Sequence, residues 1–298
     1  MKIGCLLLVV LVAIFYGLFL GGVSRKLTAR MQNRRGPTVW QNFIDLWKVF
    51  RKQSIINHGI MYYIGPIFRF TGGVGTLLLI PVMINSSCWS NLSFGGDLFV
   101  ILYFMFLGTL GMALGAGESA HPHSAIGISR GLALATASEL PFLLAMVALM
   151  AAYNTASVKD IVIAQQGGLL HWNIFTHPFA AVAAFLAFLG MMGSYPFQII
   201  VAPTEIPVGP ATEYSSTHLS FMFSGGAVFG VAKYVLIMDL FLGGANDLVT
   251  VLWKTFLIFL WPLFITNVYP RFRTEDAVRF FWYIPALSGV IGLLIVIL

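Results

Sequence analysis

Several ionisable side chains lie inside long apolar stretches, where a charge is costly and therefore suggests a function. Arg130 and Glu139 are nine residues apart, about two and a half helical turns, so they should face nearly opposite sides. Each then needs a partner from another helix or from water. Such groups at similar depth favour a hydrated relay for protons or other ions. The candidate relay residues are Glu118, Arg130, Glu139, Glu205, Glu213, Lys233 and Asp239.

The segment 195–216 carries two of these groups, Glu205 and Glu213, as its only charges. Its four prolines exclude a continuous helix. The segment is otherwise apolar, so it should pack against protein or the membrane interface. Carboxylates in apolar surroundings are suited to carry protons.

A structural role is the alternative for each charged group, because buried ion pairs also fix helix packing. For the whole set a relay explains more, since no phosphate loop, dinucleotide fingerprint, nucleophile elbow or metal-ligand cluster accompanies it. His121 and His123 alone are a weak signal for a metal. We therefore expect no catalytic residue, no metal and no cofactor in this chain.

The elements that must position these groups are membrane-spanning helices. Of 298 residues, 58% are hydrophobic and 9% are charged, against about 25% charged in soluble domains. The apolar runs are continuous rather than alternating, which favours helices over a transmembrane β-barrel. At about 20 apolar residues per crossing, we expect an all-α polytopic membrane protein with eight transmembrane helices. The expected spans are about 3–23, 60–84, 98–117, 126–153, 176–195, 217–243, 248–269 and 280–298.

The basic residues predict the orientation. The net charge of +6 would suggest nucleic acid in a soluble protein, but the positive-inside rule explains it here. Eleven of the 17 lysines and arginines lie in the loops 24–59 and 270–279. We expect these loops to be cytoplasmic, together with 118–125 and 196–216. The protein should lie in the cell (inner or plasma) membrane, with both termini on its outer side. The first apolar run is too long for a signal peptide, so residues 1–298 should form one integral membrane domain.

The two cysteines, Cys5 and Cys88, are far apart and have no metal-ligand spacing. We expect neither a disulfide framework nor an iron–sulfur or zinc site. Cys5 lies in an apolar run and is interpreted as a packing residue.

The first loop contains an amphipathic helix at 40–50. Its apolar residues fall at 40, 43, 44, 47 and 50, which is helical spacing, and polar residues occupy the other face. Trp40 and Trp47 fit the headgroup depth of a membrane interface. Two interpretations stay open: a membrane-surface helix without a further role, or a docking platform for a cytoplasmic partner.

Three stretches together resemble one family of membrane subunits. The first is ARMQNRRGP at 29–37, followed by Gln41, Asp45 and Lys48. The second runs from Ser124 to Arg130, with Glu139 nine residues on, and the third comprises Pro196-Phe197, Glu205, Gly209 and Glu213-Tyr214-Ser215. Over nearly its whole length the chain resembles the membrane subunit shared by respiratory complex I (the NADH–quinone oxidoreductase subunit 1 family) and the group 4 membrane-bound hydrogenases.

Departures from the family pattern narrow this resemblance. Gln198 stands where the family has an acid after Pro-Phe, and Val201 and Pro203 stand where glutamates are expected. In quinone-reducing relatives this acidic loop lines the quinone chamber, so its loss argues against quinone as a substrate. The segments 25–37 and 125–130 resemble instead the subunits of formate hydrogenlyase and energy-converting hydrogenases.

The resemblance implies a membrane-anchor and coupling subunit that links electron transfer in a soluble arm to proton or sodium translocation. The implied partners are hydrogenase-like large and small subunits, iron–sulfur subunits, antiporter-like membrane subunits and membrane lipid, without nucleic acid. Iron–sulfur clusters and a nickel–iron centre would reside in those partners. The residues expected to dock the soluble arm are Arg25, Arg30, Gln32, Arg34, Arg35, Asp45 and Lys48.

Three other functions stay open. The chain would fit the quinone-binding subunit of a complex I-type NADH or ferredoxin oxidoreductase. It would also fit the equivalent subunit of a membrane-bound sulfur-reducing complex. A free-standing secondary transporter is less favoured, because it predicts an inverted internal repeat that the sequence lacks.

Overall fold

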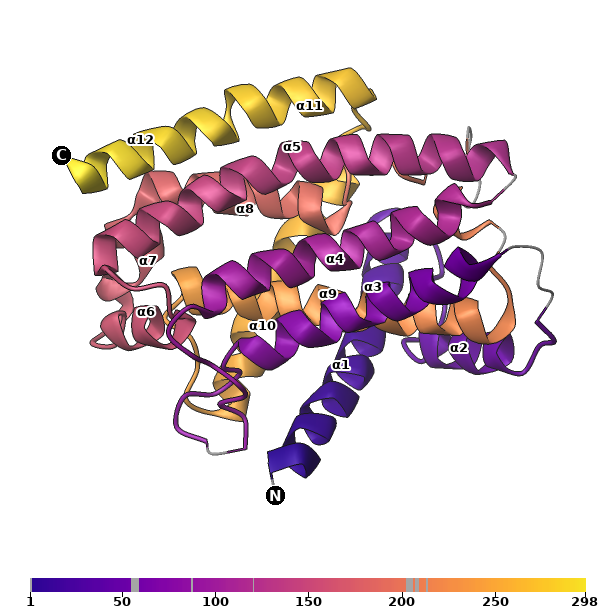
Figure 1. Cartoon of the computed structure of the whole chain (residues 1–298), viewed down its shortest axis with the longest axis horizontal. Coiled ribbons are helices and arrows are strands. Elements are labelled where there is room, and N and C mark those ends of the chain that lie inside the picture. Colours follow the sequence, from indigo (N-terminus) through magenta and orange to yellow (C-terminus); the bar gives the residue numbers. More distant parts are fainter. Residues whose placement is uncertain are drawn as a thin grey trace.

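The fold is built from helices, as the sequence predicts (Figure 1). The computed structural model describes residues 2–54, 59–86, 88–119, 121–201, 206, 209–212 and 214–298. The long helices are α1 (Lys2–Met31), α3 (Ile60–Leu79), α4 (Asp97–Gly117), α5 (Pro122–Tyr153), α9 (Ser216–Phe241) and α10 (Leu248–Val268). The others are α2 (Gln41–Phe50), α6 (Val158–Ala164), α7 (Asn173–Thr176), α8 (Pro178–Met192), α11 (Thr274–Tyr283) and α12 (Pro285–Ile297), with 3-10 turns at Leu169–His171 and Gly209–Ala211.

All eight expected spans coincide with helices, although not all are equally long or apolar. Among the described residues, six segments are long and apolar enough to cross a membrane: α1, α4, α5, α9, α10 and the run Thr274–Ile297 formed by α11 and α12. Helix α8 is apolar but has only 15 residues. Helix α3 has 20 residues, and its composition, with Arg69 and four glycines, keeps it outside those six.

Some loop boundaries differ from the expectation. Helix α5 begins at Pro122 and α11 at Thr274, so each occupies part of an expected loop, 118–125 or 270–279. The connection between α5 and α8 contains the short helices α6 and α7. The amphipathic helix is confirmed as α2, whose N-cap is Trp40 and which has no fully buried residue.

Helix α9 forms the centre of the molecule. Nearly every side chain from Val228 to Phe241 is buried, and α3, α1, α2 and α10 all pack on this helix. A helix that is apolar on every side must be buried. Because α9 also carries Lys233 and Asp239, the fold takes these two charges into its interior.

Helices α3 and α4 lie against each other in the most extensive helix pair of the fold (Figure 1). Glycines allow this close approach. A Cβ atom on Gly72 would lie 2.5 Å from the Gly108 Cα, and one on Gly65 would lie 2.8 Å from the Gly115 Cα. Small residues at crossing points are the usual way for membrane helices to bring their backbones together.

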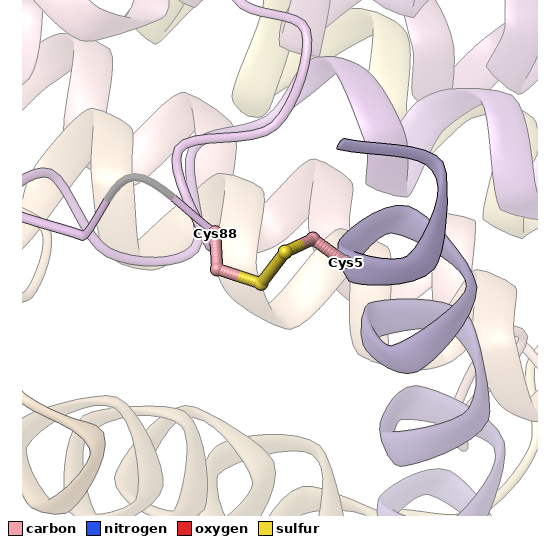
Figure 2. The surroundings of a disulfide bond; sticks show 2 residues. All are labelled: Cys5 and Cys88. Atoms are coloured by element: carbon pink, nitrogen blue, oxygen red, sulfur yellow. A yellow bond between two sulfur atoms is a disulfide. The ribbon is translucent and has the colours of Figure 1, made fainter. Parts of the chain in front are cut away.

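A disulfide between Cys5 and Cys88 joins α1 to the loop between α3 and α4 (Figure 2). The sequence-based interpretation of Cys5 as a packing residue, with no disulfide, is therefore wrong. The 83-residue separation hid the pair, because the loop folds back beside the start of α1. We call this end of the bundle the disulfide end, and the opposite end, with Arg25 to Arg35, the basic end.

Candidate functional site

Three ionisable side chains from three helices line one partly open cavity of about 110 Å³ in the helix bundle. Arg69 comes from α3, Glu139 from α5 and Lys233 from α9. The C-terminal end of α8 and Ile200 complete the wall. The cavity is large enough for several water molecules. It is therefore a polar chamber inside an apolar bundle.

The cations in this chamber share an aromatic ring. The Lys233 Nζ lies 4.1 Å from the ring centroid of Phe229, and the Arg69 Cζ lies 5.9 Å from it. The Lys233 Nζ also donates a hydrogen bond to the Met191 carbonyl at 2.5 Å. A cation–π contact and a carbonyl partly replace the hydration that a buried ammonium loses.

Glu139 is the one carboxylate among the cavity-lining residues. It is not within ion-pair distance of either cation, since Arg25–Asp45 is the one ion pair found among the described residues. It is nevertheless near enough to act electrostatically on Lys233, as Arg69 does. A proton gained or lost by Glu139 therefore changes the balance of charge around Lys233 directly.

A second polar cluster lies at the basic end, where α3 begins. The Glu118 side chain, which is exposed, accepts a hydrogen bond from the Tyr62 backbone N–H at 3.2 Å. A carboxylate is favourable at a helix N-terminus. Tyr62 stacks on Tyr214, with ring centroids 5.1 Å apart. Burial raises the pKa of Tyr214, so this phenol stays neutral. Glu118 thus has a helix-capping role besides any role in a relay.

The remaining candidate relay residues are spread over the molecule. Arg130 is half-buried on α5 and does not line the cavity. Asp239 is fully buried at the disulfide end of α9. Glu205 and Glu213 lie outside the described residues. The cavity thus brings together two of the predicted relay residues, Glu139 and Lys233.

The basic end presents the residues expected to dock a soluble arm. Arg25 of α1 pairs with Asp45 of α2 at 2.9 Å, and the Gln41 side chain donates to the same carboxylate at 2.7 Å. Slight burial alone would raise the pKa of Asp45, but these two hydrogen bonds, together with the positive charges of Arg25 and Lys48, outweigh it and hold the pKa below its ordinary value. The contact fixes the position of α2 against α1.

The α1–α2 connection folds back onto the end of α1. A Cβ atom on Gly36 would lie 2.8 Å from the Ala29 Cβ, so only glycine fits without a shift. The fold-back creates a polar surface hollow of about 420 Å³ lined by Arg25, Arg34 and Arg35. Arg34 also donates to the Gln32 side chain. Arg30 and Lys48 are exposed in the last turns of α1 and α2.

Two cations within the helix bundle were absent from the predicted site set. Arg69 and Lys254 are recognisable in the sequence as basic residues within apolar spans, but their partners depend on how the helices pack. Within the described part of the chain, no group of three metal-ligating His, Cys, Asp or Glu residues occurs.

The fold and the site together define a polytopic helical membrane protein with a charged cavity among its helices and a basic end. Comparison with known proteins agrees with this class. The family model described as NADH dehydrogenase matches residues 3–297. The chain belongs to this family, which is the complex I subunit 1-like family that the sequence motifs predict.

Individual relatives come from different respiratory complexes. Hydrogenase-4 component C of Escherichia coli (strain K12) is 29% identical, over 80% of this chain and 78% of that protein. A subunit of the NADH-quinone oxidoreductase of Solibacter usitatus (strain Ellin6076) is 28% identical, over 76% of this chain and 62% of that protein. A chain from the solved structure of the membrane-bound sulfane sulfur reductase (MBS), an archaeal respiratory membrane complex, matches with a TM-score of 0.92. That chain is 32% identical, and the match covers 99% of both chains.

Proposed function

We propose that this chain is the membrane-anchor and coupling subunit of a respiratory complex related to complex I. In this proposal it links electron transfer in a soluble arm to the translocation of protons or sodium ions. The observation that carries the proposal is the polar cavity in which Arg69, Glu139 and Lys233 meet from three helices. A carboxylate that shares a cavity with two cations can take up and release a proton as the surrounding charge changes.

The proposed soluble arm docks at the basic end. Arg25, Arg34 and Arg35 line an open hollow there, and the Arg25–Asp45 contact holds α2 beside it. Arginine is well suited to bind carboxylates of a partner surface. Replacing Arg34 and Arg35 together by glutamate should release the soluble arm from the membrane fraction.

A matched control for docking is Arg51→Glu. Arg51 is exposed at the C-terminal end of α2 and does not line the hollow. It should keep the arm bound, which co-purification and subunit-resolved mass spectrometry would measure. An intact complex in the Arg34 and Arg35 double variant contradicts the docking proposal.

The favoured partner set is that of an energy-converting hydrogenase: hydrogenase-like large and small subunits, iron–sulfur subunits and antiporter-like membrane subunits. The similarity to hydrogenase-4 component C supports it. Iron–sulfur clusters and a nickel–iron centre would then lie in the partners.

A sulfur-reducing complex is the second candidate, because the match to the sulfane sulfur reductase chain covers both chains almost completely. A quinone reductase of complex I type is the third, supported by the 28% identity to the NADH-quinone oxidoreductase relative. Sequencing the partner large subunit decides between the first two, since a nickel–iron centre needs cysteine ligands. Quinone-dependent activity of the purified complex would favour the third.

We further propose that the basic end faces the cytoplasm and that both termini lie on the outer side. The excess of lysine and arginine at the basic end supports this orientation. The Cys5–Cys88 disulfide lies at the opposite end, which suits the oxidising outer compartment. Labelling of single introduced cysteines with a membrane-impermeant thiol reagent tests it: a position at 246 should react in intact cells and one at 34 should not.

The coupling function is tested with Glu139→Gln in sealed vesicles of the complex. Coupled ion uptake should fall, whereas electron transfer with an artificial donor should persist. Thr136→Ala is the matched control, because Thr136 lies three residues away on the same helix and is exposed. Unchanged ion uptake in Glu139→Gln contradicts the proposed role of the cavity.

A further inference from the structure

A separate pair of buried charges lies at the disulfide end of the bundle. Asp239 is near the end of α9 and is fully buried, and Lys254 of α10 is 5% exposed. The Lys254 Nζ donates hydrogen bonds to the carbonyls of Leu242 and Gly244, each at 2.6 Å. It also lies 4.4 Å from the ring centroid of Trp172. The ammonium therefore has two carbonyls and an aromatic face to replace water.

The Asp239 carboxyl group has no comparable partners. Neither of its side-chain oxygens has a hydrogen-bond partner within the described residues, and Lys254 is not within ion-pair distance. The Gln165 side chain donates to the Asp239 main-chain carbonyl at 2.9 Å, not to its side chain. The charged groups that act on Asp239 are Lys254 from α10 and Asp97 from α4, with opposite effects.

An ionised carboxylate in this fully buried position would have no hydrogen-bond donor among the described residues, and burying a charge in that way is unfavourable. The geometry therefore corresponds to a neutral Asp239 that carries a proton, next to a charged Lys254 resting on carbonyls. The Oδ1 of Asp239 would lie only 3.3 Å from a Cβ atom on Gly244. Because Lys254 donates to the Gly244 carbonyl, the carboxyl and the ammonium both lie beside Gly244.

We propose that Asp239 and Lys254 form a proton-exchange site separate from the charged cavity. In the exchange step the O–H bond of Asp239 breaks and the proton passes to water. Lys254 stays an ammonium and moves from the Leu242 and Gly244 carbonyls to the new carboxylate. Protonation of Asp239 from water reverses both movements.

The position of the site suits exchange with the outer side in the proposed orientation. Asn246 and Asp247, just beyond Gly244, are exposed. Lys233 and Asp239 are six residues apart on α9, which is about 9 Å along a helix. The cavity and this site therefore occupy successive depths of the same helix. A role of the site in ion translocation rests on the proposed function, whereas the proton exchange itself does not.

Infrared spectroscopy of the purified complex in lipid tests the protonation. A protonated buried carboxyl gives a C=O stretching band apart from the amide bands. At neutral pH this band should lose one component in Asp239→Asn and remain complete in Asp247→Asn, which removes an exposed carboxylate of the α9–α10 connection. An Asp239→Asn spectrum identical to that of the wild type overturns the proposal.

The movement of Lys254 has its own test, which also serves if Asp239→Asn does not assemble. In Lys254→Met the Asp239 band should persist to a higher pH than in the wild type, by at least about one pH unit. The reason is that a nearby positive charge normally favours the ionised form by one to three pH units. Lys254→Arg keeps the charge and should titrate like the wild type. An unchanged midpoint in Lys254→Met overturns the exchange step.

Ion uptake in vesicles separates this inference from the proposed function. Asp239→Asn should lose coupled uptake and keep electron transfer with an artificial donor. Wild-type uptake in this variant removes the site from the translocation path. Wild-type uptake in Glu139→Gln contradicts the proposed function instead, so the two failures are distinguishable.

Discussion

The contact between α3 and α4 allows a quantitative prediction for Gly72→Ala. The added Cβ would lie 2.5 Å from both the Cα and the N of Gly108, and 2.8 Å from the Phe104 carbonyl oxygen. Optimal carbon–carbon contacts are about 3.5–4.0 Å, so the helices must separate by roughly 1 Å. Backbone atoms on the facing helix cannot rotate away as a side chain would. Overpacking of this kind costs about 1–3 kcal/mol.

The matched control is Gly117→Ala on the facing helix. A Cβ atom there meets nothing within 4 Å. The gain in helix propensity is up to about 1 kcal/mol in a helix interior and smaller at Gly117, the last residue of α4, so propensity works against the predicted difference and cannot produce it. Thermal or denaturant unfolding of the purified complex should find Gly72→Ala about 1–3 kcal/mol less stable than Gly117→Ala. Equal stability of the two variants would refute the close-packing argument.

The same substitution should also affect function, because Arg69 lies one turn before Gly72 on α3. Separating α3 from the bundle moves the Arg69 guanidinium relative to Glu139 and Lys233 in the cavity. Coupled ion uptake should therefore fall more in Gly72→Ala than in Gly117→Ala, at equal amounts of assembled complex.

Three further predictions concern the two ends of the bundle. Cys5→Ser, or reduction of the wild type, should lower the unfolding temperature; the 83-residue separation gives a chain-entropy limit of about 4–5 kcal/mol, and a reductant-insensitive transition contradicts the tether. Tyr214→Phe should hardly change the free energy of unfolding, because the Tyr214 hydroxyl has no partner among the described residues. Tyr62→Phe should lower it by about 0.5–1.5 kcal/mol, because the Tyr62 hydroxyl contacts Ser215. A larger loss of stability in Tyr214→Phe than in Tyr62→Phe would be inconsistent with the contacts. Because the pKa of Asp45 is below its ordinary value, the Arg25–Asp45 contact should stabilise α2 fully at pH values above the ordinary pKa and be lost as the pH falls through the lowered pKa. The contact is exposed, so it should contribute less than about 1 kcal/mol. If proteolysis of α2 depends on pH equally in the wild type and in Asp45→Asn, the contact has no such role.

Much of the fold could be predicted because the membrane imposes it. Each long apolar run must satisfy its own backbone hydrogen bonds, so runs such as 98–117 and 217–243 become helices where the sequence places them. The amphipathic spacing around Trp47 likewise predicted α2. Boundaries were less certain where a proline starts a helix: Pro122 begins α5 inside an expected loop.

The candidate site could be predicted only in part. Glu139 and Lys233 were recognisable as charges in apolar surroundings, but their shared cavity with Arg69 depends on the packing of α3, α5 and α9. Helix periodicity contains no information about which helices become neighbours. The Cys5–Cys88 disulfide was missed for the same reason, since its formation depends on where a long loop returns.

The most direct test of the central claim is a double-mutant cycle on Glu139 and Lys233, measured as ions translocated per electron in sealed vesicles. The variants are Glu139→Gln, Lys233→Met and both together, with Thr136→Ala as the control. Because the two groups act on each other in one cavity, their effects should be strongly non-additive. We expect the double variant to translocate at least as many ions per electron as the single variant with the lower ratio. Electron transfer from an artificial donor should be preserved in all four variants. Wild-type ratios in both single variants, or losses that simply add, would contradict the account.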